Sequence, residues 1–407
     1  MSRERLVTAL QGVGRGAKRS PRREARLALL RLAGRVRRPP PLPARLPRRI
    51  LIVRPDQVGD LVMAGPALSQ LRRAFPGSRL TAWVNPAAGS LWEAHPALDA
   101  LFTCRFPGLG RAPTGQLLAP YRLAVSEATR LAHQYDLAIN LRFDFWWGAM
   151  AACWAGVPVA GYDLPECRPF LSLGVAYQPA RHEVEQNLNL VAAVAQALHG
   201  QAAGSPDYGD GGPAYGVPMV EPRRGVPAGA IAIHPGAGAA VKLWTEEGWA
   251  QVADALAAEG PILLTPGSAE EVAMAERIRG RMSRPASVVA ALPLAELAGL
   301  YQRCRLVLGP DNGPLHLAEA VGTPTVVLFG PVDPAKFGPY RSGLATAGGA
   351  SHEVVQLAWP CQPCGRLDYT EKELKWHPCV RLIAPEQVLR AARRALALSS
   401  PSVPSQP

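Results

Sequence analysis

The sequence predicts an α/β protein with two Rossmann-like, doubly wound parallel sheets, and three observations lead to this fold class. The chain has 407 residues, more than one ordinary domain holds, and 48% of them are hydrophobic. Short apolar runs alternate with helical stretches, which is the pattern of parallel strands joined by helices. Residues 201–229 are crowded with Gly, Pro and Ala, divide this alternation in two, and have the composition of a linker.

The first half of the alternation begins at residue 50. The apolar run Ile-Leu-Ile-Val over 50–53 is typical of a buried parallel strand. A helix is expected from about residue 60 to residue 75, because Pro76 and Gly77 would end it. The other elements expected here are a strand over 80–84, a helix over 118–134 and a strand over 137–141.

The same alternation resumes after the linker. Apolar runs predict strands over 231–233, 262–265, 287–290, 306–309 and 325–328. Helical patterns between them predict helices over 245–258, 269–280, 294–303 and 314–321. Two such halves are expected to face a central cleft, with ligands at the carboxyl ends of the strands.

These patterns divide the chain into five parts. We expect an Arg- and Pro-rich extension over 1–49, an N-terminal domain over 50–200 and a linker over 201–229. A C-terminal domain should follow over 230–397, with a last helix that could pack back on the N-terminal domain. Residues 398–407 are expected to form a disordered tail.

The net charge of +12 is concentrated in the N-terminal extension. Residues 1–49 hold 15 Lys and Arg and only two acids, so the rest of the chain carries a net charge of −1. Such an arm suits phosphates, either in nucleic acid or on an anionic membrane. Ser20 and Pro21 favour a helix start, and leucines interleaved with arginines follow. Two interpretations remain open, a basic amphipathic helix on a membrane surface and a solvated, partly disordered extension.

Other features of the sequence indicate in which cell compartment the protein is expected. The sequence has no run of 18 apolar residues and no apolar segment behind its first residues, so neither a membrane-spanning helix nor a secretory signal is expected. Seven cysteines, an odd number, favour a reducing compartment. We therefore expect a cytoplasmic protein, which the basic extension could hold peripherally on the inner face of the cytoplasmic membrane.

Three loops that follow predicted strands carry polar groups suited to chemistry. In the first, residues 54–60, Asp60 opens a helix, where it could accept a proton or merely cap the helix. In the second, the small residues around Gly236 and the later Lys242 could cradle a diphosphate, although Lys242 could equally be a solvated surface lysine. In the third, turn residues precede a helix whose N-terminus would attract an anion; its candidate residues are Asp311, Asn312, Gly313 and His316.

These loops, in this order, resemble glycosyltransferase family 9, the ADP-heptose:lipopolysaccharide heptosyltransferases. The resemblance covers about residues 50–396. Its first match is the segment 50–68, which contains Arg-Pro-Asp-Gln-Val-Gly-Asp, and its second is His-Pro-Gly over 234–236 with Lys-Leu-Trp over 242–244. The third is Gly-Pro-Asp-Asn-Gly-Pro-Leu-His over 309–316, followed by Gly-Thr-Pro-Thr over 322–325.

The resemblance implies a GT-B fold and an inverting transfer of heptose from ADP-heptose, without a cofactor or metal ion, to a lipopolysaccharide-core or other lipid-linked or oligosaccharide acceptor. It implies that Asp60 is the general base and that 50–200 is the acceptor side and 230–397 the nucleotide-sugar side. It assigns donor contacts to Lys242, Asp311, Asn312, Gly313, His316 and, near the nucleotide base, Thr265. Two rival functions remain: transfer from another nucleotide sugar, and a non-enzymatic phosphate- or nucleic-acid-binding protein that uses the arm.

Two further segments have open roles. The aromatic stretch 140–147 could pack in the core or stack on an acceptor sugar, and it holds Arg142 and Asp144 as candidate acceptor contacts. A cysteine-rich segment could bind zinc or merely shape a loop, and its candidate ligands are Cys361, Cys364, His377 and Cys379. The other four cysteines have the surroundings of buried apolar residues.

Overall fold

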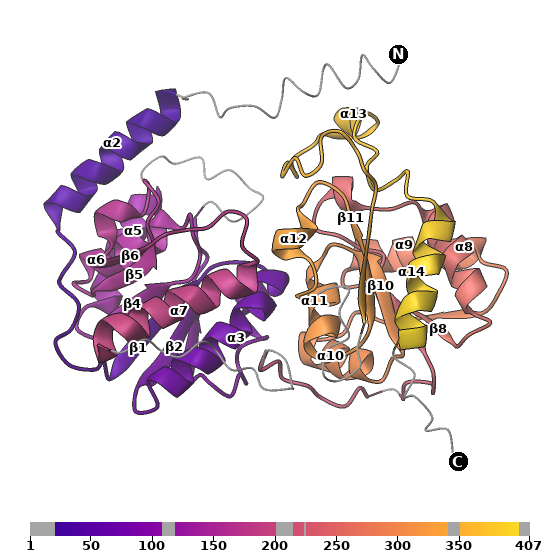
Figure 1. The fold of residues 1–407 in the computed structure, drawn as a ribbon, viewed down its shortest axis with the longest axis horizontal. Coiled ribbons are helices and arrows are strands. Elements are labelled where there is room, and N and C mark those ends of the chain that lie inside the picture. The colour runs from indigo at the N-terminus through magenta and orange to yellow at the C-terminus, as the bar shows by residue number, and fades with distance from the viewer. Residues whose placement is uncertain (1–20, 108–118, 201–214, 224, 341–350, 399–407) are drawn as a thin grey trace. The chain divides into compact units, whose positions relative to one another are not determined.

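The computed structural model describes residues 21–107, 119–200, 215–223, 225–340 and 351–398. These residues form two compact units (Figure 1). The N-terminal unit holds the described residues up to 216, and the C-terminal unit holds those from 217 onward.

The N-terminal unit is built on six parallel strands in the order β3-β2-β1-β4-β5-β6. The strands are β1 (Arg49–Arg54), β2 (Arg79–Val84), β3 (Ala100–Thr103), β4 (Leu137–Asn140), β5 (Val159–Tyr162) and β6 (Leu173–Val175). The central strand β1 is buried from Ile50 to Arg54, as its continuous apolar run predicts.

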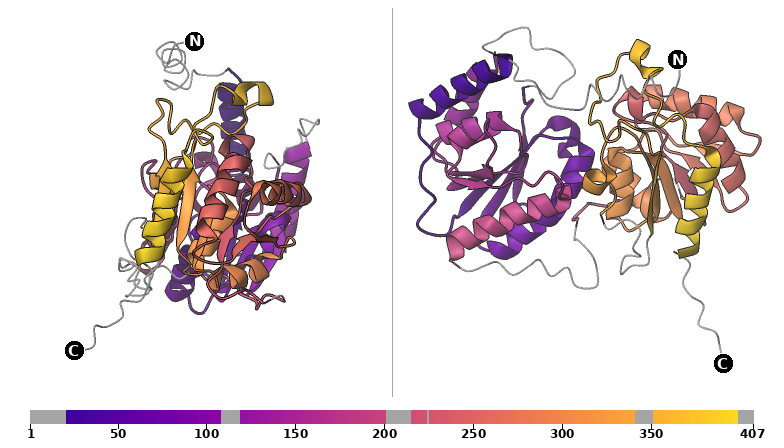
Figure 2. Two further views of the ribbon diagram at one scale, coloured as in Figure 1. Left: turned by 90° about the vertical axis from the view of Figure 1, so that its right-hand side faces the viewer. Right: turned by 45° about the horizontal axis from the view of Figure 1, so that its top comes forward.

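Helices cover both faces of this sheet (Figure 2). Helix α3 packs on α7 on one face, and α5 packs on α6 on the other. The helices are α2 (Pro21–Val36), α3 (Val58–Ala74), α4 (Pro86–Gly89), α5 (Ala119–Leu131), α6 (Trp146–Trp154) and α7 (Glu183–His199), with a 3-10 turn η1 (Arg168–Phe170).

Helix α2 begins at Pro21, where the sequence predicts a helix start, and it packs on the N-terminal unit. Its Leu27 and Leu30 are buried, and Gly34 lies so close to Pro169 of η1 that a Cβ atom would come within 2.7 Å of it. The interpretation of the whole extension as solvated and partly disordered is therefore wrong for residues 21–36, since buried leucines attach them to the unit. Residues 1–20 lie outside the described part.

The C-terminal unit repeats the plan with six parallel strands in the order β12-β11-β10-β7-β8-β9. The strands are β7 (Ile231–Ile233), β8 (Ile262–Leu264), β9 (Ala286–Val288), β10 (Leu306–Pro310), β11 (Thr325–Phe329) and β12 (His352–Gln356). The other elements are η3 (Ala240–Lys242), α8 (Glu246–Leu256), α9 (Ala269–Arg281), α10 (Leu294–Gln302), α11 (Gly313–Ala320), α12 (Pro334–Phe337), α13 (Glu371–Leu374) and α14 (Pro385–Leu398).

The two sheets confirm the predicted fold class. All nine elements predicted after residue 230 are present, with ends within a few residues of those expected. The last helix, α14, contributes Val388, Ala391 and Ala392 to the core of the C-terminal unit. The apolar face of α14 is therefore buried in its own unit.

Candidate active site

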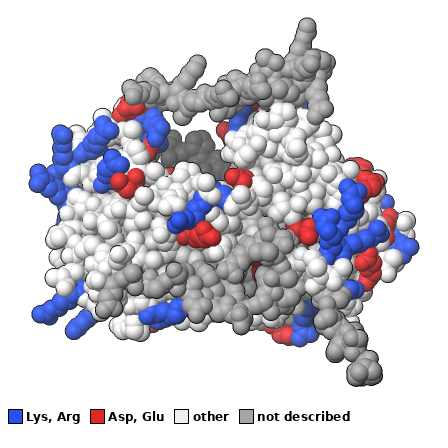
Figure 3. All heavy atoms as spheres, viewed as in Figure 1, with Lys and Arg blue, Asp and Glu red and all other residues white. Residues whose placement is uncertain are grey.

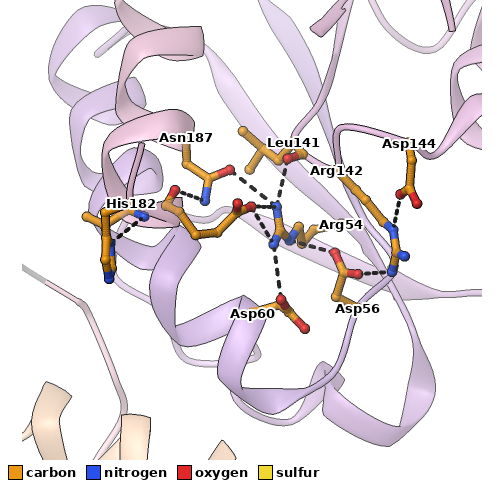
Figure 4. Close-up of polar contacts among 10 residues, drawn as sticks. Arg54, Asp56, Asp60, Leu141, Arg142, Asp144, His182 and Asn187 are labelled. Atoms are coloured by element: carbon orange, nitrogen blue, oxygen red, sulfur yellow. Dashed lines mark hydrogen bonds and ion pairs between the residues drawn. The ribbon is translucent and has the colours of Figure 1, made fainter. Parts of the chain in front are cut away.

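A buried arginine organises the loop that follows β1. Arg54, the last residue of that strand, has a side chain that is 2% exposed. Its guanidinium donates to the carbonyl oxygen of Leu141 at 2.7 Å and to the side chain of Asn187 at 3.2 Å (Figure 4). The strands β1 and β4 are neighbours, so their carboxyl ends bring residues 87 positions apart into contact.

Two buried carboxylates balance this charge. Arg54 Nε lies 2.7 Å from Asp56 Oδ2, at an angle outside hydrogen-bond geometry, and Arg54 Nη2 lies 3.2 Å from Glu183 Oε1. Burial alone would lower the pKa of Arg54, but the charges of Asp56 and Glu183 raise it above its ordinary value. Burial raises the pKa of the Asp56 carboxyl, and the charge of Arg54 opposes this shift. The cluster therefore depends on Arg54 remaining charged.

Asp60 lies at the accessible side of this cluster. It is the third residue of α3, and its Oδ1 lies 3.6 Å from Arg54 Nη2. Its side chain is 34% exposed, against 5% for Asp56 and 3% for Glu183. The residue at the N-cap of α3 is Gln57 rather than Asp60, so the interpretation of Asp60 as the helix cap is wrong. Asp60 is thus a partly exposed carboxylate held beside a fixed cation.

Arg142 and Asp144, the candidate acceptor contacts, join the same cluster from the end of β4. Arg142 pairs with Asp56, and its Nε donates to Asp144 Oδ1 at 2.6 Å. Burial lowers the pKa of Arg142, but the neighbouring Asp56 and Asp144 more than compensate, so its pKa is raised. The structure therefore brings Asp60, Arg142 and Asp144 together through Arg54 and Asp56.

Part of the aromatic stretch has the core role considered for it. Phe145 and Trp147 are buried and belong to the core of the N-terminal unit. Phe143 stacks on Tyr177 with ring centroids 4.5 Å apart. The core role is thus confirmed for Phe145 and Trp147, whose rings are not free to stack on a sugar.

In the C-terminal unit, candidate residues gather where three neighbouring strands end. His234 follows β7, Thr265 follows β8 and Asp311 follows β10, and these strands are adjacent in the sheet. Lys242 Nζ lies 2.6 Å from Asp311 Oδ2, and the Lys242 side chain is 15% exposed. The ion pair shows that Lys242 is not a solvated surface lysine.

The side chain of Asn312 joins the second and third loops. Asn312 caps α11 by accepting from the amide of Leu315 at 3.0 Å, and its Nδ2 donates to the carbonyl oxygen of Gly236 at 2.7 Å. Gly313 is the first residue of α11. His316 is buried one turn further on, and its Nδ1 lies 3.5 Å from Glu319 Oε2. A cationic side chain and a helix N-terminus therefore lie on the same edge of the sheet, an arrangement that stabilises negative charge.

A chain of buried polar groups supports this edge and was not predicted. Thr265 Oγ1 lies 3.0 Å from Tyr301 Oη, which lies 3.4 Å from His234 Nδ1. On the other side of the imidazole ring, His234 Nε2 lies 3.5 Å from Glu271 Oε2, and this contact lowers the pKa of Glu271.

The sequence signals for this chain were weak. His234 belongs to the His-Pro-Gly motif, but the motif alone does not show what its ring contacts. Glu271 occurs three residues after Ser268, a spacing that is typical of a helix cap. Its side chain instead accepts from the amide of Gly267 at 2.7 Å. Only the fold brings Glu271 to His234.

The cysteine-rich segment does not form a metal site among the described residues, where no group of three or more His, Cys, Asp or Glu side chains is placed to share an ion. Cys364 Sγ lies 3.5 Å from Tyr369 Oη, whose ring packs on His377 with centroids 3.9 Å apart. Cys361 is half-buried and Cys379 is buried. The remaining four cysteines are free and buried, as predicted: Cys104, Cys153, Cys167 and Cys304.

Two α/β units define the architecture of a GT-B glycosyltransferase. Each is built on a parallel sheet and has charged side chains at the carboxyl ends of its strands. Residues 126–372, more than half of the chain, match the family model "Glycosyltransferase family 9 (heptosyltransferase)". The chain therefore belongs to glycosyltransferase family 9. This membership decides against the alternative of a non-enzymatic binding protein.

Individual relatives agree with this assignment. Lipopolysaccharide heptosyltransferase 1 of Pseudomonas aeruginosa is 27% identical over 334 residues, which cover 78% of this chain and 86% of the relative. The crystal structure of a family 9 glycosyltransferase from Veillonella parvula matches with a TM-score of 0.63 and 20% identity, over 86% of this chain and 97% of that one. The Escherichia coli heptosyltransferase WaaC with ADP-2-deoxy-2-fluoro heptose matches with a TM-score of 0.62 and 19% identity, over 85% and 99%.

Proposed function

We propose that this glycosyltransferase transfers heptose from ADP-heptose to a lipopolysaccharide-core or related surface-glycan acceptor, with inversion at the anomeric carbon. The donor is suggested by the relative whose structure contains an ADP-heptose analogue, and the acceptor by the lipopolysaccharide heptosyltransferase among the sequence relatives. The observation that supports the chemistry best is Asp60, a partly exposed carboxylate among the buried ion pairs at the end of β1.

In the proposed reaction, Asp60 is the general base. Its carboxylate takes the proton of an acceptor hydroxyl while that oxygen attacks the anomeric carbon of the donor. The bond between this carbon and the diphosphate oxygen breaks, and ADP leaves with the bonding electrons. A single in-line displacement of this kind inverts the configuration and needs one base on the acceptor side.

The departing diphosphate needs positive charge on the donor side. We assign this role to Lys242 and to the N-terminus of α11 at Gly313, with His316 in the same helix. Asp311 holds the Lys242 ammonium, and Asn312 joins the α11 cap to the loop at Gly236. Thr265 belongs to the polar chain through His234 and is proposed to lie near the nucleotide base. These groups supply the charge stabilisation, and we propose no cofactor or metal ion.

Replacement of Asp60 by Asn tests the base. Asn keeps the size of the side chain but cannot take the proton, so we expect kcat to fall by about 10²–10⁴. Asp163→Asn is the matched control, because Asp163 is also paired with an arginine in the N-terminal unit and its side chain is 39% exposed. Both variants should keep the thermal stabilisation produced by ADP. Turnover by Asp60→Asn at the wild-type rate would refute the assignment.

Donor identity needs a separate experiment. Thermal shifts with ADP, UDP and GDP should show the largest stabilisation by ADP, since a ligand that binds the folded state stabilises it by mass action. ADP-heptose should then support product formation with a lipopolysaccharide-core acceptor. A larger shift with UDP or GDP would favour the alternative of another nucleotide sugar.

We also propose that residues 1–49 hold the enzyme peripherally on the anionic inner face of the cytoplasmic membrane. None of the described helices is long and apolar enough to cross a membrane. The support is the net charge of +13 in these residues. Replacement of the exposed Arg31, Arg35, Arg38 and Arg45 by Gln leaves the buried leucines of α2 and the first residue of β1 in place. It should strongly weaken co-sedimentation with anionic vesicles, whereas equal binding by both forms would contradict this proposal.

A further inference from the structure

Helix α2 has an apolar stripe on its outer face. Leu29, Leu32 and Val36 are 57%, 58% and 80% exposed. Their spacing, i, i+3 and i+7, places them on one side of a helix with 3.6 residues per turn. Leu27 and Leu30, which are buried, lie on the other side. The helix therefore has two apolar faces, and only one of them is covered by the described part of the chain.

The outer stripe cannot be covered by a rotation of the helix. Leu30 is fully buried, and Gly34 brings the helix backbone against Pro169. At either end, Arg23 Nε donates to Glu166 Oε1 at 3.0 Å, and Arg37 donates to the carbonyl oxygen of Trp154. These contacts fix the orientation of the helix about its own axis, so the stripe stays on the surface.

Basic side chains lie beside the stripe. Figure 3 shows Lys and Arg gathered over α2. Between α2 and η1 lies an open pocket of about 400 Å³, which is lined by Arg31, Arg35 and Arg168. Arg168 is paired with Asp163, but neither Arg31 nor Arg35 forms an ion pair with any described residue. Exposed apolar groups flanked by cations with no described counter-charge are the features of a helix that lies in a membrane interface.

We propose that the outer face of α2 docks the N-terminal unit on an anionic lipid bilayer. Leu29, Leu32 and Val36 enter the boundary between headgroups and acyl chains, and Arg31 and Arg35 bind lipid phosphates at the pocket. A bilayer fits this face better than a second copy of the chain, because a symmetric pairing of α2 helices would bring their arginines together. This inference rests on the proposed membrane association but not on the sugar-transfer chemistry.

Co-sedimentation with vesicles tests the face directly. The triple variant Leu29→Gln, Leu32→Gln, Val36→Gln removes the stripe and keeps every charge. We expect its partition onto phosphatidylcholine–phosphatidylglycerol vesicles to fall about tenfold or more. A second triple variant, Val125→Gln, Leu382→Gln, Leu398→Gln, is the matched control, since these side chains are 55%, 53% and 57% exposed elsewhere. It should bind like the wild type.

A second experiment tests the two arginines beside the pocket. Arg31→Gln with Arg35→Gln should weaken binding to the anionic vesicles by about fivefold per arginine and leave the weak binding to pure phosphatidylcholine unchanged. Rising NaCl concentration should remove the difference between this variant and the wild type, because salt screens the charges.

Three outcomes would overturn the inference. Wild-type binding by the stripe variant would do so. If replacement of Arg31, Arg35, Arg38 and Arg45 by Gln still weakened binding, the membrane association would stand without the apolar stripe of α2. Equal losses in the stripe variant and its matched control would show a non-specific effect. A lipid-free dimer that the stripe variant makes monomeric would identify a second copy as the occupant. Turnover on a soluble acceptor should be the same in all variants, so its failure would concern the proposed reaction alone.

Discussion

Replacement of Arg54 by Met should destabilise the N-terminal unit strongly. Met has a similar length but no charge, so the buried carboxylates of Asp56 and Glu183 would lose their shared cation. Removal of one partner from a buried ion pair costs about 3–5 kcal/mol. Arg142 would still pair with Asp56, so the lower end of this range, about 3 kcal/mol at pH 7, is expected.

The control for this variant lies on the same strand. Arg49 pairs with Asp136 at the surface, with side chains 47% and 28% exposed, and Arg49→Met should therefore cost less than about 1 kcal/mol. Because the chain has two units, a global unfolding curve would mix them. Hydrogen exchange in peptides that cover β1 and β4 reports on the N-terminal unit alone.

The pH dependence provides a second check on Arg54. In Arg54→Met the folded-state pKa values of the buried carboxyls rise above their unfolded values of about 4. The deficit should thus be largest at neutral pH and shrink as the pH falls through the raised folded-state pKa values, because below the unfolded pKa values the carboxyls are protonated in both states. An Arg54→Met deficit that is as small as that of Arg49→Met, or that does not change with pH, would refute this account of the cluster.

Three other changes have distinct expected results. Lys242→Met should raise the Kd for ADP about 10- to 100-fold in calorimetry, since a charge-assisted contact contributes about 1.5–3 kcal/mol, and an unchanged Kd would place the diphosphate elsewhere. Gly236→Ala puts a Cβ atom 2.1 Å from the Glu271 carboxyl, which would have to leave the Gly267 amide and His234, and the loss of these contacts should cost about 1 kcal/mol in thermal unfolding. Gly238→Ala, which meets nothing within 4 Å, is its control, and equal losses would contradict the clash. Burial lowers the pKa of His95 to about 4, so its neutral ring stabilises the fold above the unfolded pKa of about 6.5. That contribution should be lost as the pH falls towards 4, and His95→Gln should flatten the profile, whereas parallel profiles would exclude His95.

The central strands were predictable because their amino-acid composition is continuously apolar, as burial on both faces requires. The run over 50–53 and the strand 306–310 are buried on both faces, and continuous apolar sequence is the mark of such strands. The strands β3, β5, β6 and β12 were not predicted, and of these β3 and β12 lie at sheet edges. Partly exposed side chains give them no clear pattern: Ala100–Thr103 has no buried residue, and His352–Gln356 has only two.

Helix α7 was not predicted, although buried apolar residues recur at helical spacing from Val184 to Ala195. Its first turns also bury the polar residues Glu183, Gln186 and Asn187, and these concern the site. Two of these three residues face Arg54, which is 129 positions away from Glu183 and 133 from Asn187. A polar residue is expected at the surface unless a buried partner is known.

The sequence by itself determined the alternation of the central strands with their helices and the loops that carry polar groups. Both follow from local composition: apolar runs make buried strands, and turn residues after them mark the ends where parallel sheets bind ligands. It also determined that the positive charge is concentrated before residue 50. Only the tertiary structure decided that Asp60 lies beside a buried cation rather than at a helix cap, that Lys242 meets Asp311, and that α2 turns three apolar side chains outward. The first two contacts join residues far apart in the chain, and a single sequence does not show which distant residues meet. The third depends on which face of α2 is covered, and a single sequence does not show how a helix is oriented on its unit.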